Sequence, residues 1–291
     1  MTAIAQSGAD PAGITTRRVR RRPTTAWVGT LPFIGYVGLF LLLPTGIIIW
    51  NAFKNPAGAF TLSGISALGG SAVRSYFVGS FELAGISSVS GAVLGAVLAY
   101  AVASGPRDGI MRRLYLSGSG VLAQFGGVTL AFAFLVTIGP TTGYLLHAGW
   151  YYSFPWGISL IYIYFQIPLM VLVFLPAIDG LKVQWREAAE NLGGSTWHYW
   201  RHIGGPLLTP AFLGGMLLLF ANGLSAYATI VAWENQISYI VPQQISISMI
   251  SEVGLLNFNQ ADVLALGMVI LVAIVMTGYA LLTRRAAKWL R

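Results

Sequence analysis

The 291-residue sequence contains no cysteine and few charged side chains. The absence of cysteine excludes disulfide bonds, thiolate metal sites and thiol nucleophiles. Only 9% of the residues are charged, whereas a typical soluble domain has roughly 25%. The chain also lacks a G-x-x-x-x-G-K-[ST] phosphate-binding loop and a G-x-S-x-G nucleophile elbow. We therefore expect no catalytic residues in this chain, and no hydrolysis of ATP by the chain alone.

Histidine is also scarce, with three residues at positions 147, 198 and 202. His198 and His202 have the i, i+4 spacing of two metal ligands on one helix, but no glutamate lies between them to serve as a general base. We interpret them as solvated side chains of an interfacial helix. No metal or cofactor is expected.

What the chain has instead is apolar sequence, with 56% hydrophobic residues and a mean hydropathy of +0.71. The apolar residues form blocks of about 20 residues, the length that crosses the hydrocarbon core as a helix. We predict an all-α integral membrane protein with six transmembrane helices. The predicted spans are residues 30–51, 77–103, 114–138, 155–178, 207–233 and 261–283.

The distribution of lysine and arginine predicts the orientation, because cationic loops resist translocation. Six spans place both termini on the same side of the membrane. That side then holds fifteen of the seventeen basic residues, and the other loops hold only Lys54 and Arg74. The fifteen are Arg17, Arg18, Arg20, Arg21, Arg22, Arg107, Arg112, Arg113, Lys182, Arg186, Arg201, Arg284, Arg285, Lys288 and Arg291. Both termini are therefore predicted to be cytoplasmic.

This distribution also accounts for the net charge of +8 without a nucleic-acid partner. We expect a disordered basic tail over residues 1–26, a membrane domain over 27–285 with a cytoplasmic loop at about 180–206, and a basic tail over 286–291. Residues 1–22 are too polar for a signal peptide, so the first apolar block is expected to remain as an anchor.

The cytoplasmic loop between the fourth and fifth spans contains the polar stretch EAAENLGGSTWHYWRHIGGP, residues 187–206. Its first residues favour a helix that Gly193 and Gly194 end. Ser195 is expected to cap a second short helix that ends at Gly204, Gly205 and Pro206. The alternative is a plain interfacial connector whose tryptophans lie at the level of the lipid headgroups.

The spacing of this loop resembles the E-A-A-x3-G-x9-I-x-L-P loop of binding-protein-dependent ABC importers. The matching residues are Glu187, Ala188, Ala189, Gly193, Ile203 and Pro206, and Gly205 stands where that family usually has leucine. In the family, the loop belongs to the membrane-spanning permease subunit, with the type I (MetI-like) fold. The sequence from 188 to 232 looks like the branch that serves polyamine, phosphonate and ferric or thiamine uptake.

The resemblance implies that this loop couples transport to a separate cytosolic ABC ATPase, present in two copies. It also implies a second permease subunit, similar or identical, and an extracytoplasmic substrate-binding protein, all at a plasma (inner) membrane of bacterial type. Glu187 would accept charged hydrogen bonds from the ATPase, and Gly193 would permit a turn that a side chain would obstruct.

Polar side chains inside membrane spans are costly, so they face protein or a wet cavity. The candidates for lining a substrate pathway are Glu82, Gln124, Thr129, Gln166, Asn222, Ser225 and Tyr227. Each of them could instead hydrogen-bond a neighbouring helix. Glycines such as Gly91 and Gly95 predict close helix contacts, and Pro168 with Gly126 and Gly127 predicts kinks.

The outer loop 234–260 contains Glu234 and Glu252 and no basic residue, which favours a cationic substrate such as a polyamine. Two other classes of function stay open. A secondary transporter would need charged coupling residues inside the membrane, and Glu82 is the only such candidate. A membrane-embedded enzyme would need clustered His, Asp or Glu at depth, which the sequence lacks.

Overall fold

The computed structural model describes residues 26–55, 58–106, 108–139, 150, 153–233, 240–250 and 258–288. These residues form helices and no strand, apart from one isolated bridge between Lys54 and Phe60. The chain divides into two compact parts, residues 1–46 and 47–291, which we describe separately. The predicted basic tail 1–26 lies outside the described residues except for Ala26, and the predicted tail 286–291 is described only as far as Lys288, where α13 ends.

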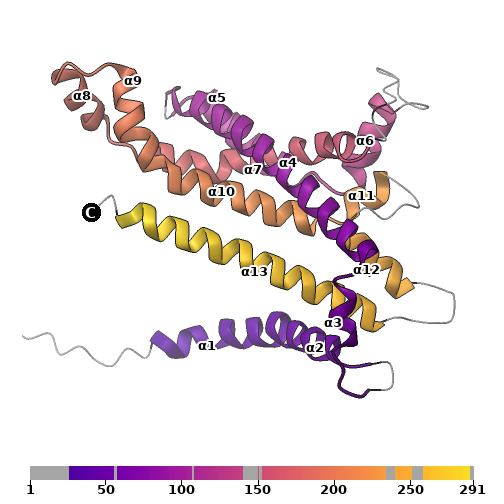
Figure 1. Cartoon of the computed structure of the whole chain (residues 1–291). Coiled ribbons are helices and arrows are strands. Elements are labelled where there is room, and N and C mark those ends of the chain that lie inside the picture. Colours follow the sequence, from indigo (N-terminus) through magenta and orange to yellow (C-terminus); the bar gives the residue numbers. More distant parts are fainter. Residues whose placement is uncertain are drawn as a thin grey trace, which may run out of the picture. The chain divides into compact units, whose positions relative to one another are not determined.

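The first part contains α1 (Ala26–Val37), the π-helix η1 (Gly38–Leu42) and the beginning of α2 (Leu43–Ala52). The helices of the second part are shown in Figure 1. They are α3 (Ser63–Ala67), α4 (Ser71–Ala103), α5 (Ile110–Gln124), α6 (Val128–Ile138), α7 (Trp156–Asp179), α8 (Val183–Asn191), α9 (Thr196–Tyr199), the π-helix η3 (Trp200–Gly204), α10 (Gly205–Ser225), α11 (Ala228–Trp233), α12 (Val241–Ile250) and α13 (Phe258–Lys288).

The predicted spans correspond to these helices, with two differences. Five helices are long and apolar enough to cross a membrane, and the count rises to six if α5 and α6, bent by 99° at their junction, form one span. The third span is therefore broken at residues 125–127 and not continuous. The fifth ends at Ser225 and resumes as α11. In addition, α12 lies in a segment predicted to be a loop.

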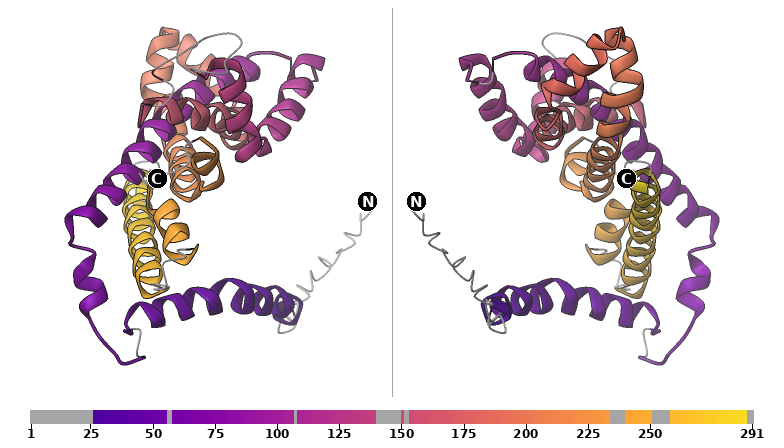
Figure 2. Two further views of the ribbon diagram at one scale, coloured as in Figure 1. Left: turned by 90° about the vertical axis from the view of Figure 1, so that its right-hand side faces the viewer. Right: turned by 90° about the vertical axis from the view of Figure 1, so that its left-hand side faces the viewer.

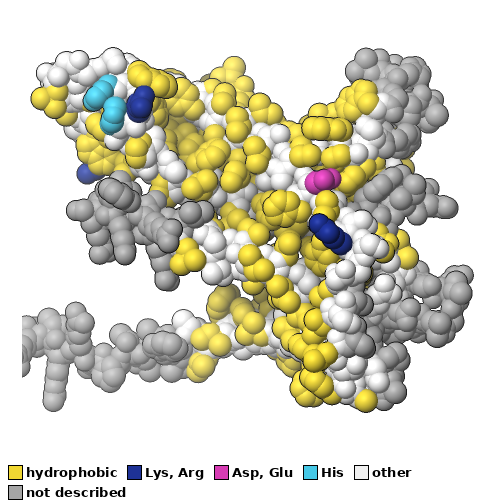
Figure 3. Space-filling view, in the orientation of Figure 1, with side chains coloured by type: hydrophobic (Ala, Val, Ile, Leu, Met, Phe, Trp, Pro, Cys, Tyr) yellow, Lys and Arg dark blue, Asp and Glu magenta, His cyan; other side chains and the backbone are white. Residues whose placement is uncertain are grey.

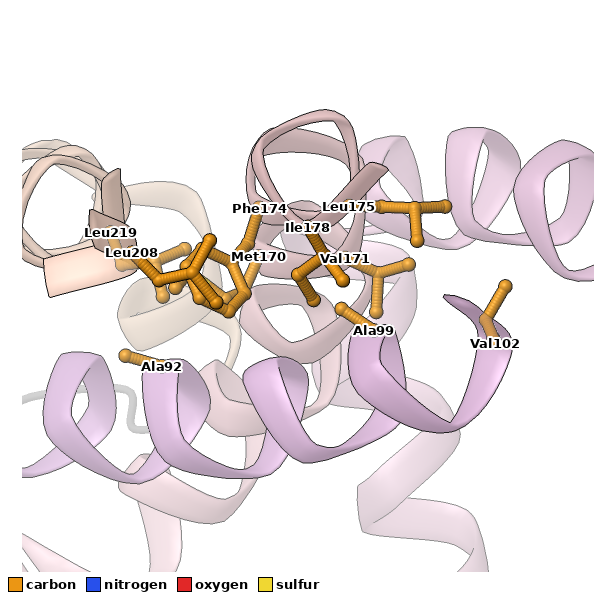
Figure 4. Close-up of a cluster of buried hydrophobic side chains, with 10 residues drawn as sticks. All are labelled: Ala92, Ala99, Val102, Met170, Val171, Phe174, Leu175, Ile178, Leu208 and Leu219. Carbon is orange, nitrogen blue, oxygen red and sulfur yellow. The ribbon is translucent and has the colours of Figure 1, made fainter. Parts of the chain in front are cut away.

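Helix α7 is the most buried of the membrane-length helices, which explains why its sequence is apolar on every side. One end of α7 packs in a cluster with Leu83, Leu130 and Ile230. The other end packs in a second cluster with α4 and α10, drawn in Figure 4. That cluster consists of Ala92, Ala99, Val102, Met170, Val171, Phe174, Leu175, Ile178, Leu208 and Leu219.

Small residues allow α4 to approach α7 closely, as predicted. A Cβ atom added at Gly91 would lie 2.8 Å from the Cβ of Gln166, and one added at Gly95 would lie 2.5 Å from the Cβ of Met170. Small side chains of this kind let the backbones of membrane helices meet. The close contact predicted for Gly91 and Gly95 is confirmed.

Two contacts bring three segments together at one end of the helix bundle. Arg112 at the start of α5 forms an ion pair with Asp179 at the end of α7. The rings of Tyr100 near the end of α4 and Trp200 in η3 meet edge to face, with centroids 5.4 Å apart. The loop between α4 and α5 and the loop after α7 therefore share one end, as their common excess of basic residues predicts. Figure 1 shows α8 and α9 at that end, and the right-hand view of Figure 2 looks onto it.

Candidate functional site

The segment from Val183 to Gly204, which we call the elbow, consists of α8, a tight turn, α9 and η3. Gly193 ends α8 with a positive φ of 78°. Its N–H donates to the carbonyl of Glu190 at 2.9 Å, and the N–H of Gly194 donates to the carbonyl of Ala189 at 2.9 Å. These two bonds form a Schellman cap, which requires a left-handed residue at the position of Gly193. The predicted end of the first helix is confirmed.

The second helix of the elbow begins as predicted but does not end as predicted. The hydroxyl of Ser195 accepts a hydrogen bond from the N–H of His198 at 3.3 Å and caps α9. Gly204, Gly205 and Pro206 do not end this helix, because it continues through the π-turn η3 into α10. Pro206 lies directly after the π-turn, inside this continuous helix, and contributes no N–H to it. The second helix of the elbow and α10 therefore form one continuous helix, Thr196–Ser225.

The structure gives a reason for Gly205, where the resembling family usually has leucine. A Cβ atom at Gly205 would lie 2.6 Å from the carbonyl oxygen of Trp200, and one at Gly204 would lie 2.8 Å from the Trp200 ring. Gly204 therefore leaves room for the Trp200 ring, and Gly205 leaves room for the Trp200 carbonyl within the π-turn. The turn is helical, and Gly204 is buried in it.

The predicted residues of the elbow differ in exposure. Glu187, Ala188 and Pro206 are exposed, whereas Ala189 is buried and Ile203 is half-buried. Ala189 thus belongs to the packing inside the elbow. Glu187 and Ala188 present a free surface on α8.

Two apolar side chains of the elbow are exposed, and sequence reasoning missed the first of them. Leu192 is 89% exposed at the tip of the elbow, and Trp197 is 72% exposed on α9. On α8, the guanidinium of Arg186 donates to the carboxylate of Glu190 at 2.8 Å, and this bond raises the pKa of Arg186 above its ordinary value. The elbow combines a charged helix with projecting apolar groups, as a docking surface does. Their exposure follows from the tertiary structure and has no signal in the sequence.

At the far end of α10 from the elbow, two spans are interrupted side by side. Between α5 and α6, the N–H of Gly126 donates to the carbonyl of Gln124 at 3.0 Å, and Gly127 has φ 72° and ψ −144°. Between α10 and α11, the carbonyl of Ala226 accepts a hydrogen bond from the hydroxyl of Tyr162 on α7. A Cβ atom at Gly127 would lie 3.6 Å from the Cβ of Ala228, so the two interruptions adjoin. Irregular backbone of this kind is found at membrane depth only where protein or a cavity covers it.

Several predicted pathway residues lie near these interruptions. Gln124 and Thr129 flank the first interruption, and Asn222 and Ser225 precede the second; all four side chains are exposed. The hydroxyl of Tyr227 lies 2.7 Å from the hydroxyl of Ser246 on α12. Glu82 on α4 is also exposed.

Gln166 differs from these residues because it is fully buried. Its Nε2 donates to the hydroxyl of Ser87 at 3.2 Å and to the carbonyl of Leu219 at 3.4 Å. It therefore joins α7 to α4 and α10. This placement matches the alternative interpretation, in which the polar side chain connects helices.

A polar stripe on α5, which the sequence reading overlooked, extends the set of exposed polar residues. Arg113, Ser117, Gly120 and Gln124 are spaced at i, i+4, i+7 and i+11, which places them on one helix face. Arg113, Ser117 and Gln124 are exposed. The stripe runs from the elbow end of the bundle to the interruption at Gly127. Its helical periodicity is the signal that could have revealed it.

The described residues contain no group of three His, Asp or Glu side chains that could hold a metal ion. The rings of His198 and His202 lie with their centroids 4.2 Å apart and are tilted by 33° to each other. Figure 3 shows histidine side chains at the end where α8 and α9 lie, on a face otherwise dominated by hydrophobic groups. The outer-loop residues Glu234 and Glu252 lie outside the described residues.

Comparisons with known proteins identify the fold. The chain superposes on a chain of a bacterial ABC transporter involved in the import of the acidic polysaccharide alginate with a TM-score of 0.71 at 17% identity, covering 89% of this chain and 95% of that one. It superposes on a chain of the MetNI methionine ABC transporter with a TM-score of 0.54 at 14% identity, covering 74% of this chain and 95% of that one. The fold is that of ABC transporter permeases.

Sequence comparison finds partial relatives. A probable sulfate transport system permease protein of Marchantia polymorpha is 36% identical over 77 residues, covering 26% of this chain and 27% of that protein. The molybdenum transport system permease protein of Escherichia coli K12 is 30% identical over 87 residues, covering 30% of this chain and 38% of that protein. The matches thus span little more than a third of these relatives at most. No family profile matches the chain.

Proposed function

We propose that this chain is the permease subunit of an ABC importer, and that the elbow docks on a cytosolic ATPase. The observation that carries the proposal is the continuous helix from α9 of the elbow into α10, Thr196–Ser225. A displacement of the elbow would be carried along this helix to its far end, where it stops at Ser225 beside the interruption in the third span. Closure and opening of an attached ATPase would therefore move the two interruptions.

In this proposal the exposed polar residues around the interruptions line half of a pathway. Gln124, Asn222 and Ser225 are exposed although they lie in membrane-length helices. In a bilayer such side chains face a wet cavity or a partner protein. A second permease facing them would complete the pathway, and a substrate-binding protein would deliver the cargo to it. The alginate transporter has been crystallised with a periplasmic protein bound to an alginate pentasaccharide, which supports this kind of partner.

We propose an oxyanion as the substrate class. The relatives are permeases of sulfate and molybdenum transport systems, which do not support the polyamine predicted from the sequence. The polar stripe of α5 offers a guanidinium, a hydroxyl and an amide, and α5 contains no carboxylate. Uptake of labelled sulfate, molybdate and spermidine by cells expressing the complete transporter distinguishes these substrates. Uptake of spermidine alone would overturn the assignment.

The docking proposal is tested by comparing two glutamates on α8. Glu187 is exposed, and Glu190 is engaged by Arg186 within the elbow. We expect Glu187→Ala to lower substrate-stimulated ATPase activity and uptake together by roughly tenfold or more, because a charge-assisted bond contributes about 1.5–3 kcal/mol. Glu187→Asp should retain both activities.

Glu190→Ala is the matched control, with the same change of charge one turn away. It removes a surface ion pair of small value, so coupling should change by less than about threefold. Equal activity in the Glu187→Ala and Glu190→Ala transporters would exclude Glu187 from the docking contact.

A further inference from the structure

Helix α5 has an exposed apolar face as well as its polar stripe. Met111, Leu114 and Tyr115 are 72%, 61% and 48% exposed. Met111 and Tyr115 lie on the opposite side of α5 from Ser117 and Gln124, as the helical period of 3.6 residues requires, and Leu114 lies at the border between the two sides. The apolar face of α5 is therefore distinct from its pathway face.

A groove runs along this apolar face between α4, α5 and α7. It comprises a cavity of about 440 Å³ and a second of about 230 Å³, and the two share Leu98, Met111 and Tyr115 in their linings. The larger cavity extends along the membrane span to Tyr164 and Pro168 on α7. The smaller one ends among Gly105, Pro106, Gly109 and Arg112. The walls are apolar apart from a few groups, and Arg112 is the only charged one among the described residues that line the groove.

Arg112 gives the groove a positive end. Its side chain is 10% exposed and pairs with Asp179, but its Nη1 is buried and, among the described residues, has no hydrogen-bond partner. Burying a guanidinium nitrogen without a hydrogen-bond partner costs the free energy of its desolvation. Arg113, the next residue, is exposed on the polar stripe outside the groove, and Asp108 is exposed at the end of the preceding loop. With Asp179 already engaged by Arg112, an anion placed at the end of the groove meets the Nη1 of Arg112.

We infer that this groove holds one anionic phospholipid, with an acyl chain along α5 and α7 and the phosphate at Arg112. An apolar slot that ends in an arginine matches the two chemistries of such a lipid, and basic pockets between membrane helices bind lipid headgroups of this kind. The predicted orientation places Arg112 at the cytoplasmic leaflet. In the proposed transporter this lipid is neither the transported substrate nor a part of the ATPase. Bound in this groove, it would fix the position of α5 against α4 and α7.

Two glycines of α5 provide a matched pair of variants. Gly118 lines the larger cavity and Gly120 lies on the polar stripe, and a Cβ atom at either position meets nothing within 4 Å. Each variant is purified as the complete transporter, depleted of lipid with detergent and titrated with phosphatidylglycerol. Native mass spectrometry then counts the lipid molecules bound per chain. The readout needs neither ATP nor substrate, so it is independent of the proposed transport function.

We expect Gly118→Phe to weaken binding of phosphatidylglycerol about tenfold or more, because each buried methylene group contributes about fourfold. Gly120→Phe should bind the lipid as the wild type does. Equal binding by Gly118→Phe and wild type would overturn the inference. Loss of the second permease from the Gly118→Phe complex would also overturn it, because the groove would then be a subunit interface.

The headgroup is tested separately with phosphatidylcholine and with the double variant Arg112→Gln, Asp179→Asn, which removes the ion pair as a whole. We expect phosphatidylcholine to bind the wild type more weakly than phosphatidylglycerol, and the double variant to reduce the preference about fivefold, the effect of one arginine at a lipid surface. Arg113→Gln, on the polar stripe outside the groove, is the control and should reduce the preference less. Equal affinity for the two lipids in the wild type would remove Arg112 from the site. Displacement of the lipid by inorganic phosphate alone would show that the groove binds only the anion.

Discussion

The backbone conformation of Gly193 determines how α8 ends. A Cβ atom at this position meets open space, so the glycine is required by its φ of 78° and not by crowding. The sequence predicts that a side chain here would obstruct the turn. In the structure the obstacle is the backbone conformation that the turn requires, and not a lack of space for the side chain. The Schellman cap depends on the left-handed conformation, which β-branched residues rarely adopt.

We predict that Gly193→Val uncouples uptake from ATP hydrolysis, whereas Gly193→Asn retains coupling. Left-handed backbone costs roughly 1–2 kcal/mol for ordinary residues, and asparagine tolerates it better. Uptake and ATPase activity of the reconstituted transporter check this prediction. If valine and asparagine gave the same activities, the turn conformation would not matter for coupling.

Gln166 on α7 donates hydrogen bonds to α4 and α10, which leads to a prediction about the thermal stability of the protein. We expect Gln166→Met to change the unfolding temperature in detergent only slightly, because hydrogen bonds between membrane helices contribute about 0.6 kcal/mol on average. Gln166→Glu should lower it strongly, because it buries a charge without a partner. A large loss of substrate specificity in a stable Gln166→Met transporter would instead place Gln166 in the pathway.

At the scale of elements, the interruptions distinguish the third and fifth spans from the continuous α4 and α7. The chain bends between α5 and α6 through a γ-type turn, which Gly127 follows. The φ and ψ values of Gly127 are accessible almost only to glycine. The interruption is therefore specified locally, while its position beside α11 depends on packing.

We predict that Gly127→Ala destabilises the protein by roughly 1–3 kcal/mol, the cost of a non-glycine residue in this region. Gly120→Ala, on the same span and with open space around it, should be close to neutral. Thermal unfolding of both variants in detergent measures the difference. Equal unfolding temperatures would mean that the bend does not need a glycine.

At the scale of the whole molecule, the absence of cysteine makes the topology directly measurable. Leu192 at the tip of the elbow and Leu62 before α3 are 89% and 60% exposed. We predict that Leu192→Cys in intact cells resists a membrane-impermeant maleimide and that Leu62→Cys reacts with it. Inside-out vesicles should reverse the pattern, and the parent chain provides a background without thiols. Labelling of both positions from the same side would contradict the predicted topology.

Much of the fold could be predicted from the sequence because the membrane imposes strong local constraints. Apolar blocks of span length, the asymmetric arginines and the Gly193–Gly194–Ser195 turn all act through hydrophobicity, charge or backbone conformation within a few residues. The elbow was therefore found with its correct first helix end and its serine cap. Its continuation into α10 was missed because a π-turn accommodates Gly204 and Gly205 without ending the helix.

Composition and spacing by themselves determined that this is a helical membrane protein with a two-helix loop between the fourth and fifth predicted spans, because burial in lipid and helix capping are properties of short segments. Only the tertiary structure decided that Gln166 is buried, that Leu192 projects from the elbow, and that Arg112 lies at the end of an apolar groove. Those outcomes depend on which helices meet, and contacts between residues distant in sequence leave no periodic signal in either segment alone.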